Sequence, residues 1–181
     1  MKVTLEQMRR FDFFEETDSP EIVYHMTSRK NAQSIINDGK VKSFGDYVTW
    51  FFTDIEHVLA YIYISGADRG RQYYDTNGRE TTDPPLNHAD TVVLKLACRK
   101  EPLMWYKEIV NSSKTMYRNM EKTVEKMWEI MCNIRVCHYG DLRFTKVLDV
   151  IELTDIDKLP EPKEIAQYKI LEEEMKRKYR P

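Results

Sequence analysis

The sequence predicts one α+β domain that spans residues 1–181. Its length is usual for a single domain, and a hydrophobic content of 41% is enough to form a core. Short apolar stretches typical of strands are separated by helical patterns and irregular loops, without the regular alternation of a doubly wound parallel sheet. The chain also has neither a GxGxxG motif nor a Walker loop, which argues against Rossmann and P-loop nucleotide sites.

Apolar periodicity and capping residues predict the elements of the first 65 residues. They are a helix at 4–16 capped by Thr4, a strand at 22–24, a helix from Thr27 or Ser28 to Gly39, a strand at 48–52, and a helix that Thr53 begins in a capping box with Glu56. The strand at 48–52 is rich in β-branched and aromatic residues, so it is expected to be buried.

The second part of the chain is predicted by the same signals. Its elements are a long loop at 66–90 rich in Gly and Pro, a strand at 91–98, an amphipathic helix at 114–132, a strand at 144–153 and a charged helix at 163–179. The end of the 114–132 helix is open, since 130–136 could instead begin a strand. The methionines of this helix are typical of a core stripe.

The composition argues against several classes of protein. A net charge of −2 gives no overall signal for nucleic acid, and three cysteines without a CxxC pair argue against a disulfide framework. No HxxxH motif or paired Cys/His spacing is present, so no metal site is expected. The N-terminus lacks an apolar signal core and no run is long enough to span a membrane, which predicts a cytoplasmic protein without a membrane partner.

Two short motifs carry the functional hypothesis. Tyr24-His25-Met26-Thr27 places a histidine where an apolar strand is expected to stop, and Trp50-Phe51-Phe52-Thr53 closes the next strand. A histidine at the end of a strand is well placed to point into a cleft. With Gly39 between the motifs and Ala60-Tyr61 after them, this order resembles the NAD-binding core of the ADP-ribosyltransferase superfamily. The resemblance covers residues 22–64 and implies a split, mixed or antiparallel sheet with flanking helices.

The resemblance also implies NAD as cofactor. In the superfamily, the histidine of the first motif hydrogen-bonds the ribose of NAD, and aromatic residues pack on the nicotinamide. Arg29 could meet the pyrophosphate through charge-assisted bonds. The residues expected to bind the cofactor are therefore His25, Met26, Thr27, Arg29, Tyr47, Phe51 and Tyr61. Two of them depart from the family pattern, because Met26 replaces a glycine and Phe51 replaces a tyrosine that could donate a hydrogen bond.

The catalytic pair implied by the resemblance is His25 and Glu129. Cleavage of the nicotinamide–ribose bond builds oxocarbenium character, which a carboxylate in the cleft can stabilise. Glu129 lies in Lys-Met-Trp-Glu-Ile-Met, which resembles a segment of DNA-targeting ADP-ribosyltransferase toxins. The rival carboxylates are Glu101, Asp141 and Glu152, and Glu129 could also be an ordinary solvated helix residue.

The expected function is transfer of ADP-ribose from NAD to a macromolecular acceptor, protein or nucleic acid, as in a bacterial or phage effector or toxin. Hydrolysis of NAD is a related activity. One rival is an RNA 2′-phosphotransferase, which would require Arg29, Arg69 and Arg71 to converge near His25. The other is a catalytically inactive nucleotide- or partner-binding module, favoured by Met26 and Phe51.

Overall fold

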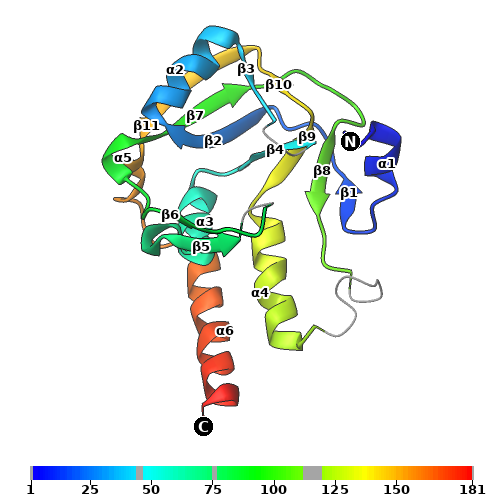
Figure 1. The fold of residues 1–181 in the computed structure, drawn as a ribbon. Helices are drawn as coiled ribbons and strands as arrows, with labels where there is room; N and C mark the ends of the chain where they lie inside the picture. The colour runs from blue at the N-terminus through cyan, green and yellow to red at the C-terminus, as the bar shows by residue number, and fades with distance from the viewer. Residues whose placement is uncertain (1, 44–46, 75–76, 112–119, 181) are drawn as a thin grey trace.

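The computed structural model describes residues 2–43, 47–74, 77–111 and 120–180, and it confirms the predicted α+β class (Figure 1). All strand pairs are antiparallel. One sheet has the order β1-β8-β9-β4, formed by Phe14–Glu16, Trp105–Glu108, Val136–Tyr139 and Val48–Phe51. A second sheet has the order β11-β7-β2, formed by Lys146–Glu152, Thr91–Ala97 and Ile22–Ser28. Two short pairs join β10 (Leu142–Arg143) to β3 (Lys40–Val41) and β5 (Arg71–Tyr74) to β6 (Glu80–Asp83).

The two larger sheets meet at one isolated bridge between Tyr24 and Phe52. The amide of Tyr24 donates to the Phe52 carbonyl at 2.8 Å, and the amide of Phe52 donates back at 2.9 Å. Strands β2 and β4 touch here and do not continue as a ladder, so this is the one backbone bridge between the two sheets in the described part of the chain. His25 follows this point directly.

Strand β2 is longer than predicted and carries both polar residues of the first motif inside the ladder. It pairs with β7 from Ile22 opposite Ala97 to Ser28 opposite Thr91. Because side chains alternate along a strand, His25 and Thr27 share the face of buried Val23, and the neighbouring Met26 points to the opposite face. The sequence pattern stopped at residue 24 because polar residues usually end an apolar strand, whereas here they line a pocket.

The two helices that follow these strands differ in how they begin. Helix α2 (Arg29–Asp38) starts as predicted, with the Ser28 hydroxyl accepting from the Asn31 amide at 3.2 Å. It ends at Gly39, whose φ of 64° is the left-handed conformation that glycine adopts most easily. The prediction of a capping box at Thr53 is wrong, because α3 (Glu56–Ser65) begins after Ile55 without a side-chain cap.

Two other predictions are corrected in the N-terminal and central segments, and one strand was missed. The predicted 4–16 helix is only α1 (Leu5–Arg9), and the chain then turns into β1. The predicted loop at 66–90 contains the β5–β6 hairpin between two short 3₁₀ turns, η1 (Ala67–Arg69) and η2 (His88–Asp90). Strand β8 was not predicted, because its four residues lack a clear alternation of apolar and polar side chains.

The C-terminal half follows the predicted patterns more closely. Helix α4 (Lys122–Asn133) forms the described part of the predicted 114–132 helix, and residues 114–119 lie outside the described residues. The strand alternative for 130–136 is wrong, since β9 begins only at Val136. Strand β11, the short α5 (Leu153–Ile156) and α6 (Lys163–Tyr179) complete the chain, and α4 and α6 run side by side away from the sheets (Figure 1). No helix in the described ranges is both long enough and apolar enough to cross a membrane.

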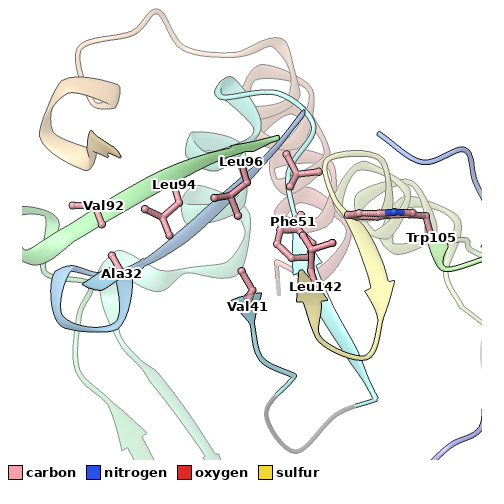
Figure 2. Packing of buried hydrophobic residues seen from close by; sticks show 9 residues of the cluster. Ala32, Val41, Phe51, Val92, Leu94, Leu96, Trp105 and Leu142 are labelled. Carbon is pink, nitrogen blue, oxygen red and sulfur yellow. The ribbon is translucent and has the colours of Figure 1, made fainter. Parts of the chain in front are cut away.

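The main core lies between the two sheets and is covered by α2. Trp105 from β8, Phe51 from β4 and Leu94 from β7 are all fully buried and belong to one cluster (Figure 2). The rings of Phe51 and Trp105 lie 5.6 Å apart between centroids. Apolar burial of this kind contributes about 25 cal/mol per Å², so the cluster holds together two sheets that share only one backbone bridge.

Candidate functional site

A pocket of about 480 Å³ opens beside the end of β2, between α2, β3 and β4. This volume falls within the range of small-molecule sites. The residues that line it come from four elements and the short segments beside them: His25, Thr27, Asn31, Ser34, Ile35, Asp38, Lys40, Val41, Lys42, Val48, Thr49 and Trp50. Hydroxyl, amide and charged groups thus face an apolar floor, an arrangement that can orient a polar ligand through a few directed bonds.

His25 is a half-buried titratable group that lines this pocket. Its Nδ1 lies 3.3 Å from the carbonyl oxygen of Trp50, and its ring lies 5.4 Å from the buried ring of Phe51. Burial lowers the pKa of His25, and the bond to Trp50 opposes that effect only in part. A carbonyl oxygen only accepts, so Nδ1 carries the proton and the neutral ring keeps a lone pair on Nε2. His25 can therefore accept a hydrogen bond from a ligand hydroxyl.

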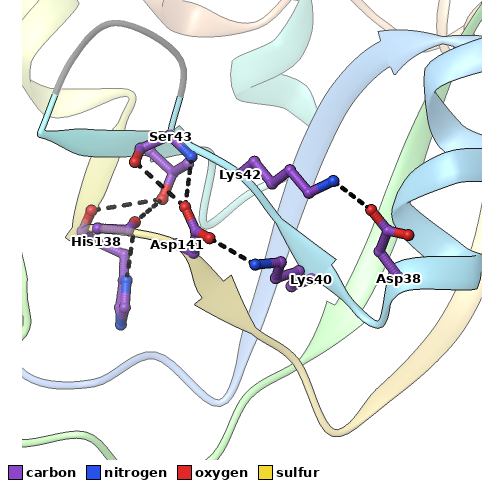
Figure 3. A network of polar contacts seen from close by, with 8 residues as sticks. Asp38, Lys40, Lys42, Ser43, His138 and Asp141 are labelled. Carbon is purple, nitrogen blue, oxygen red and sulfur yellow. Dashed lines mark hydrogen bonds and ion pairs between the residues drawn. The ribbon is translucent and has the colours of Figure 1, made fainter.

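Two lysines of the β3 segment line the pocket, and each faces a carboxylate (Figure 3). Lys40 Nζ lies 2.9 Å from Asp141 Oδ2, and Lys42 Nζ lies 2.5 Å from Asp38 Oδ2. Asp141 is held further by Ser43, whose amide donates to it at 3.0 Å and whose hydroxyl donates at 3.3 Å. The Ser43 amide, followed by Lys40, lowers the pKa of Asp141, so this carboxylate is ionised at neutral pH.

Only some of the residues expected to bind NAD lie at this pocket. His25 and Thr27 line it, whereas Met26 faces the other side of the sheet and packs in the cluster beside α3. Tyr61 packs in that cluster too, with its ring 5.4 Å from Phe52. Met26 and Tyr61 therefore lie apart from His25 and Thr27, in the case of Met26 because alternate strand residues point to opposite faces.

The aromatic residues and the arginine of the expected set are also elsewhere. Phe51 is 0% exposed, so it offers no surface to a ligand, and the nicotinamide-stacking role predicted for it is corrected. Tyr47 packs against Phe11, with ring centroids 5.7 Å apart. Arg29 is exposed at the end of β2, where it donates to both carboxylate oxygens of Glu152 and to the Ala89 carbonyl.

Glu129 does not share a cleft with His25. It is exposed on α4 and lines a separate depression between α4 and α6, together with Asn133, Gln167 and Ile170. The expectation of a common cleft is thus wrong. The toxin-like segment forms part of α4 here, and Glu129 faces the depression beside α6.

The rival carboxylates are placed very differently. Glu101 lies 3.0 Å from Nε2 of the fully buried His138, and Glu152 is occupied by Arg29. Asp141 does not line the pocket itself, but it is paired with Lys40, which does. Proximity to the pocket therefore favours Asp141 among the three.

The cysteines are poor nucleophiles. Burial, followed by the charge of Glu101, raises the pKa of Cys98 to about 11, and burial raises the pKa of Cys132 to about 12. Burial also raises the pKa of Cys137. A thiol must be deprotonated to attack, so these side chains are packing residues at neutral pH.

Sequence reasoning missed most of the polar lining: Asn31, Ser34, Asp38, Lys40 and Lys42. On the sequence they are ordinary polar residues of a helix and of a loop. A signal was present in the spacing of Asn31, Ser34 and Asp38, which recur every three to four residues and therefore share one face of α2. Their meaning depends on what that face meets, which only the fold decides.

A second polar centre lies outside the pocket, at His88. Its Nδ1 lies 2.6 Å from Asp157 and its Nε2 lies 2.6 Å from Asp68, so the ring joins η1 to the end of α5. The hydrogen bond to Asp68 comes first among the causes that raise the pKa of His88, and Asp157 adds to it. Because both ring nitrogens face carboxylates, the bridge is complete only when the ring is protonated.

The contribution of His88 to stability is expected to depend on pH. A histidine with a raised pKa stabilises the folded state fully below its unfolded pKa of about 6.5, and loses this effect as pH rises through the folded value. His88→Asn should therefore lower the free energy of unfolding more at pH 5.5 than at pH 9. Urea titrations of both proteins at the two pH values measure this difference. An equal loss at both values would show that the charge of His88 contributes nothing.

No family model, curated protein or solved structure matches the chain. The assignment of a function to this pocket therefore rests on the sequence and the structure.

Proposed function

We propose that the pocket beside β2 binds NAD and that the protein transfers ADP-ribose from it to a macromolecular acceptor. The observation that carries this proposal is the placement of His25, next to the single bridge between two antiparallel sheets and on the wall of a pocket of about 480 Å³. The split arrangement of sheets is what the resemblance to ADP-ribosyltransferases implies. A strand histidine on the wall of a ligand-sized pocket agrees with the ribose-binding role of the first motif.

The chemistry assigned to His25 follows from its protonation. The neutral ring donates from Nδ1 to Trp50 and keeps Nε2 as an acceptor, which suits a ribose hydroxyl. Thr27 lies two residues further along the same face and adds a hydroxyl to the wall. Because the ring is held by a backbone carbonyl, it needs little reorganisation when the ligand binds.

The carboxylate that stabilises the oxocarbenium ion is assigned to Asp141. Its three polar contacts, two from Ser43 and one from Lys40, hold it in one orientation behind the lining residue Lys40. A preorganised negative charge is the feature that such a transition state requires. In this assignment Lys40 is a positioning residue, since it acts through Asp141.

Of the two rivals, a non-catalytic NAD-binding module retains support. The burial of Phe51 removes the expected stacking aromatic, and Glu129 lies in another depression. The RNA 2′-phosphotransferase loses its support because Arg29, Arg69 and Arg71 are absent from the described lining of the pocket of His25. Release of nicotinamide from NAD, with and without cell extract as acceptor source, separates the enzyme from the binding module.

NAD is expected to raise the melting temperature of the protein. A ligand that binds only the folded state stabilises it by about 2.7 kcal/mol at 100 times its Kd. His25→Ala should remove most of this shift, because it deletes the acceptor for the ribose while leaving a half-buried site. Thermal unfolding with and without NAD measures both shifts.

The matched control is His88→Ala, which removes a histidine outside the pocket and should keep the full shift. A full shift in His25→Ala would contradict the proposed role of His25. No shift in the wild-type protein would overturn NAD as the ligand.

A further inference from the structure

The two lysines at the pocket are held with unequal strength. Lys40 is paired with Asp141, which Ser43 fixes through two more hydrogen bonds. Lys42 pairs with Asp38, four residues earlier, and also lies within the field of Asp141; the side chains of Lys42 and Asp38 are 47% and 39% exposed. The pair of Lys42 is therefore the one that a ligand can exchange.

Energies support this exchange. An exposed ion pair of this kind contributes little to stability because water and salt screen it, so Lys42 loses little when it leaves Asp38 for another anion. The hydrogen bond between them lowers the pKa of Asp38 and raises that of Lys42, so both are charged at neutral pH. A phosphate that enters the pocket can thus replace Asp38 as the partner of Lys42 without any change of protonation.

We propose that Lys42 is the phosphate anchor of the pocket and that Asp38 is a built-in competitor that weakens the binding of phosphorylated ligands. This inference rests on the proposed function and assigns the pyrophosphate of NAD to the β3 side of the pocket, with the ribose at His25. Asp38 also lines the pocket, so its negative charge repels any bound anion whose charge Lys42 does not neutralise. Lys40 remains with Asp141 and does not take this role.

The two members of the pair should therefore change affinity in opposite directions. Lys42→Ala is expected to raise the Kd of NAD about tenfold, which corresponds to roughly 1.4 kcal/mol. Asp38→Asn frees Lys42 and is expected to lower this Kd several-fold. Nicotinamide riboside, which has no phosphate, should bind both variants with the wild-type Kd. If the pair of Lys42 and Asp38 had only a structural role, each variant would change the Kd of NAD and the Kd of nicotinamide riboside by the same factor.

The experiment is isothermal titration of NAD, nicotinamide riboside and inorganic pyrophosphate into the wild-type protein and the two variants. Lys30→Ala is the matched control, because Lys30 is an exposed lysine of α2 that lies outside the described lining. The dependence of NAD affinity on salt should also be weaker in Lys42→Ala, since one ionic contact is lost.

The outcomes distinguish this inference from the function on which it rests. An unchanged NAD affinity in Lys42→Ala, with binding still lost in His25→Ala, would overturn the phosphate anchor and leave the proposed function in place. Pyrophosphate binding that depends on Lys42 and Asp38, in a protein that does not bind NAD, would support the anchor and overturn NAD as the ligand. Tighter NAD binding in Asp38→Asn together with weaker binding in Lys42→Ala would support both.

Discussion

Replacing Trp105 by alanine is expected to lower the free energy of unfolding by about 3–5 kcal/mol, the usual cost of truncating a fully buried aromatic residue. Trp105 is 0% exposed and packs against Phe51 and the edge of His138. Trp105 belongs to the β1-β8-β9-β4 sheet. Its cluster includes three apolar side chains of β7 in the other sheet, Val92, Leu94 and Leu96. Because the sheets share one backbone bridge, the cavity left by the variant weakens the joint between them.

Urea unfolding followed by circular dichroism measures this loss. Trp105→Phe is the informative companion, because the indole Nε1 is buried without a hydrogen-bond partner among the described residues and phenylalanine removes that group. The loss should therefore be clearly smaller than for alanine. Tyr179→Ala, at a side chain that is 68% exposed, should stay within about 0.5 kcal/mol of the wild type. Equal stability of Trp105→Ala and the wild type would contradict the role of this cluster.

Asp141→Asn is expected to lower nicotinamide release about 100-fold, the usual effect of removing one electrostatic stabiliser. The amide keeps the shape of the side chain and an acceptor for the Ser43 amide, but it loses the negative charge. That charge interacts most strongly with the transition state, so the Kd of NAD should change little. The measurement is nicotinamide release at saturating NAD, beside a direct binding titration.

Glu129→Gln is the matched comparison, because it makes a comparable carboxylate-to-amide change at an exposed residue of α4. It should keep the wild-type turnover, since Glu129 lies in a different depression from His25. Full turnover in Asp141→Asn would remove Asp141 from the mechanism. Binding of NAD by the wild-type protein without release of nicotinamide, with or without cell extract as acceptor source, would replace the proposed enzyme by a non-catalytic NAD-binding module.

Local signals predicted the elements whose sequence pattern agrees with their final environment. Helix α6 has the predicted bounds, because Pro162 precedes it and an apolar stripe with Ile165 and Leu171 faces the body of the protein. Helix α2 ends at Gly39, where the left-handed conformation is required. The strands around residues 48–52 and 91–98 are buried ladders, as their β-branched and aromatic content indicated.

Non-local pairing produced the elements that were missed. Strand β8 forms because β1 and β9 lie on its two sides, and neither neighbour is close to it in the sequence. The β5–β6 hairpin consists mainly of charged and polar residues, so its pattern is that of a loop. In both cases the hydrogen bonds to a partner strand outweigh a weak local preference.

The sequence by itself determined the α+β class and the helix ends at Gly39 and Tyr179, because these depend on local propensity and capping. The tertiary structure decided which side chains share a pocket. It placed Lys42 and Asp38 beside His25, buried Phe51 in the core and turned Glu129 to the outside. A pocket is formed by faces of elements that are distant along the chain, and the register of each strand selects which alternate residues reach it.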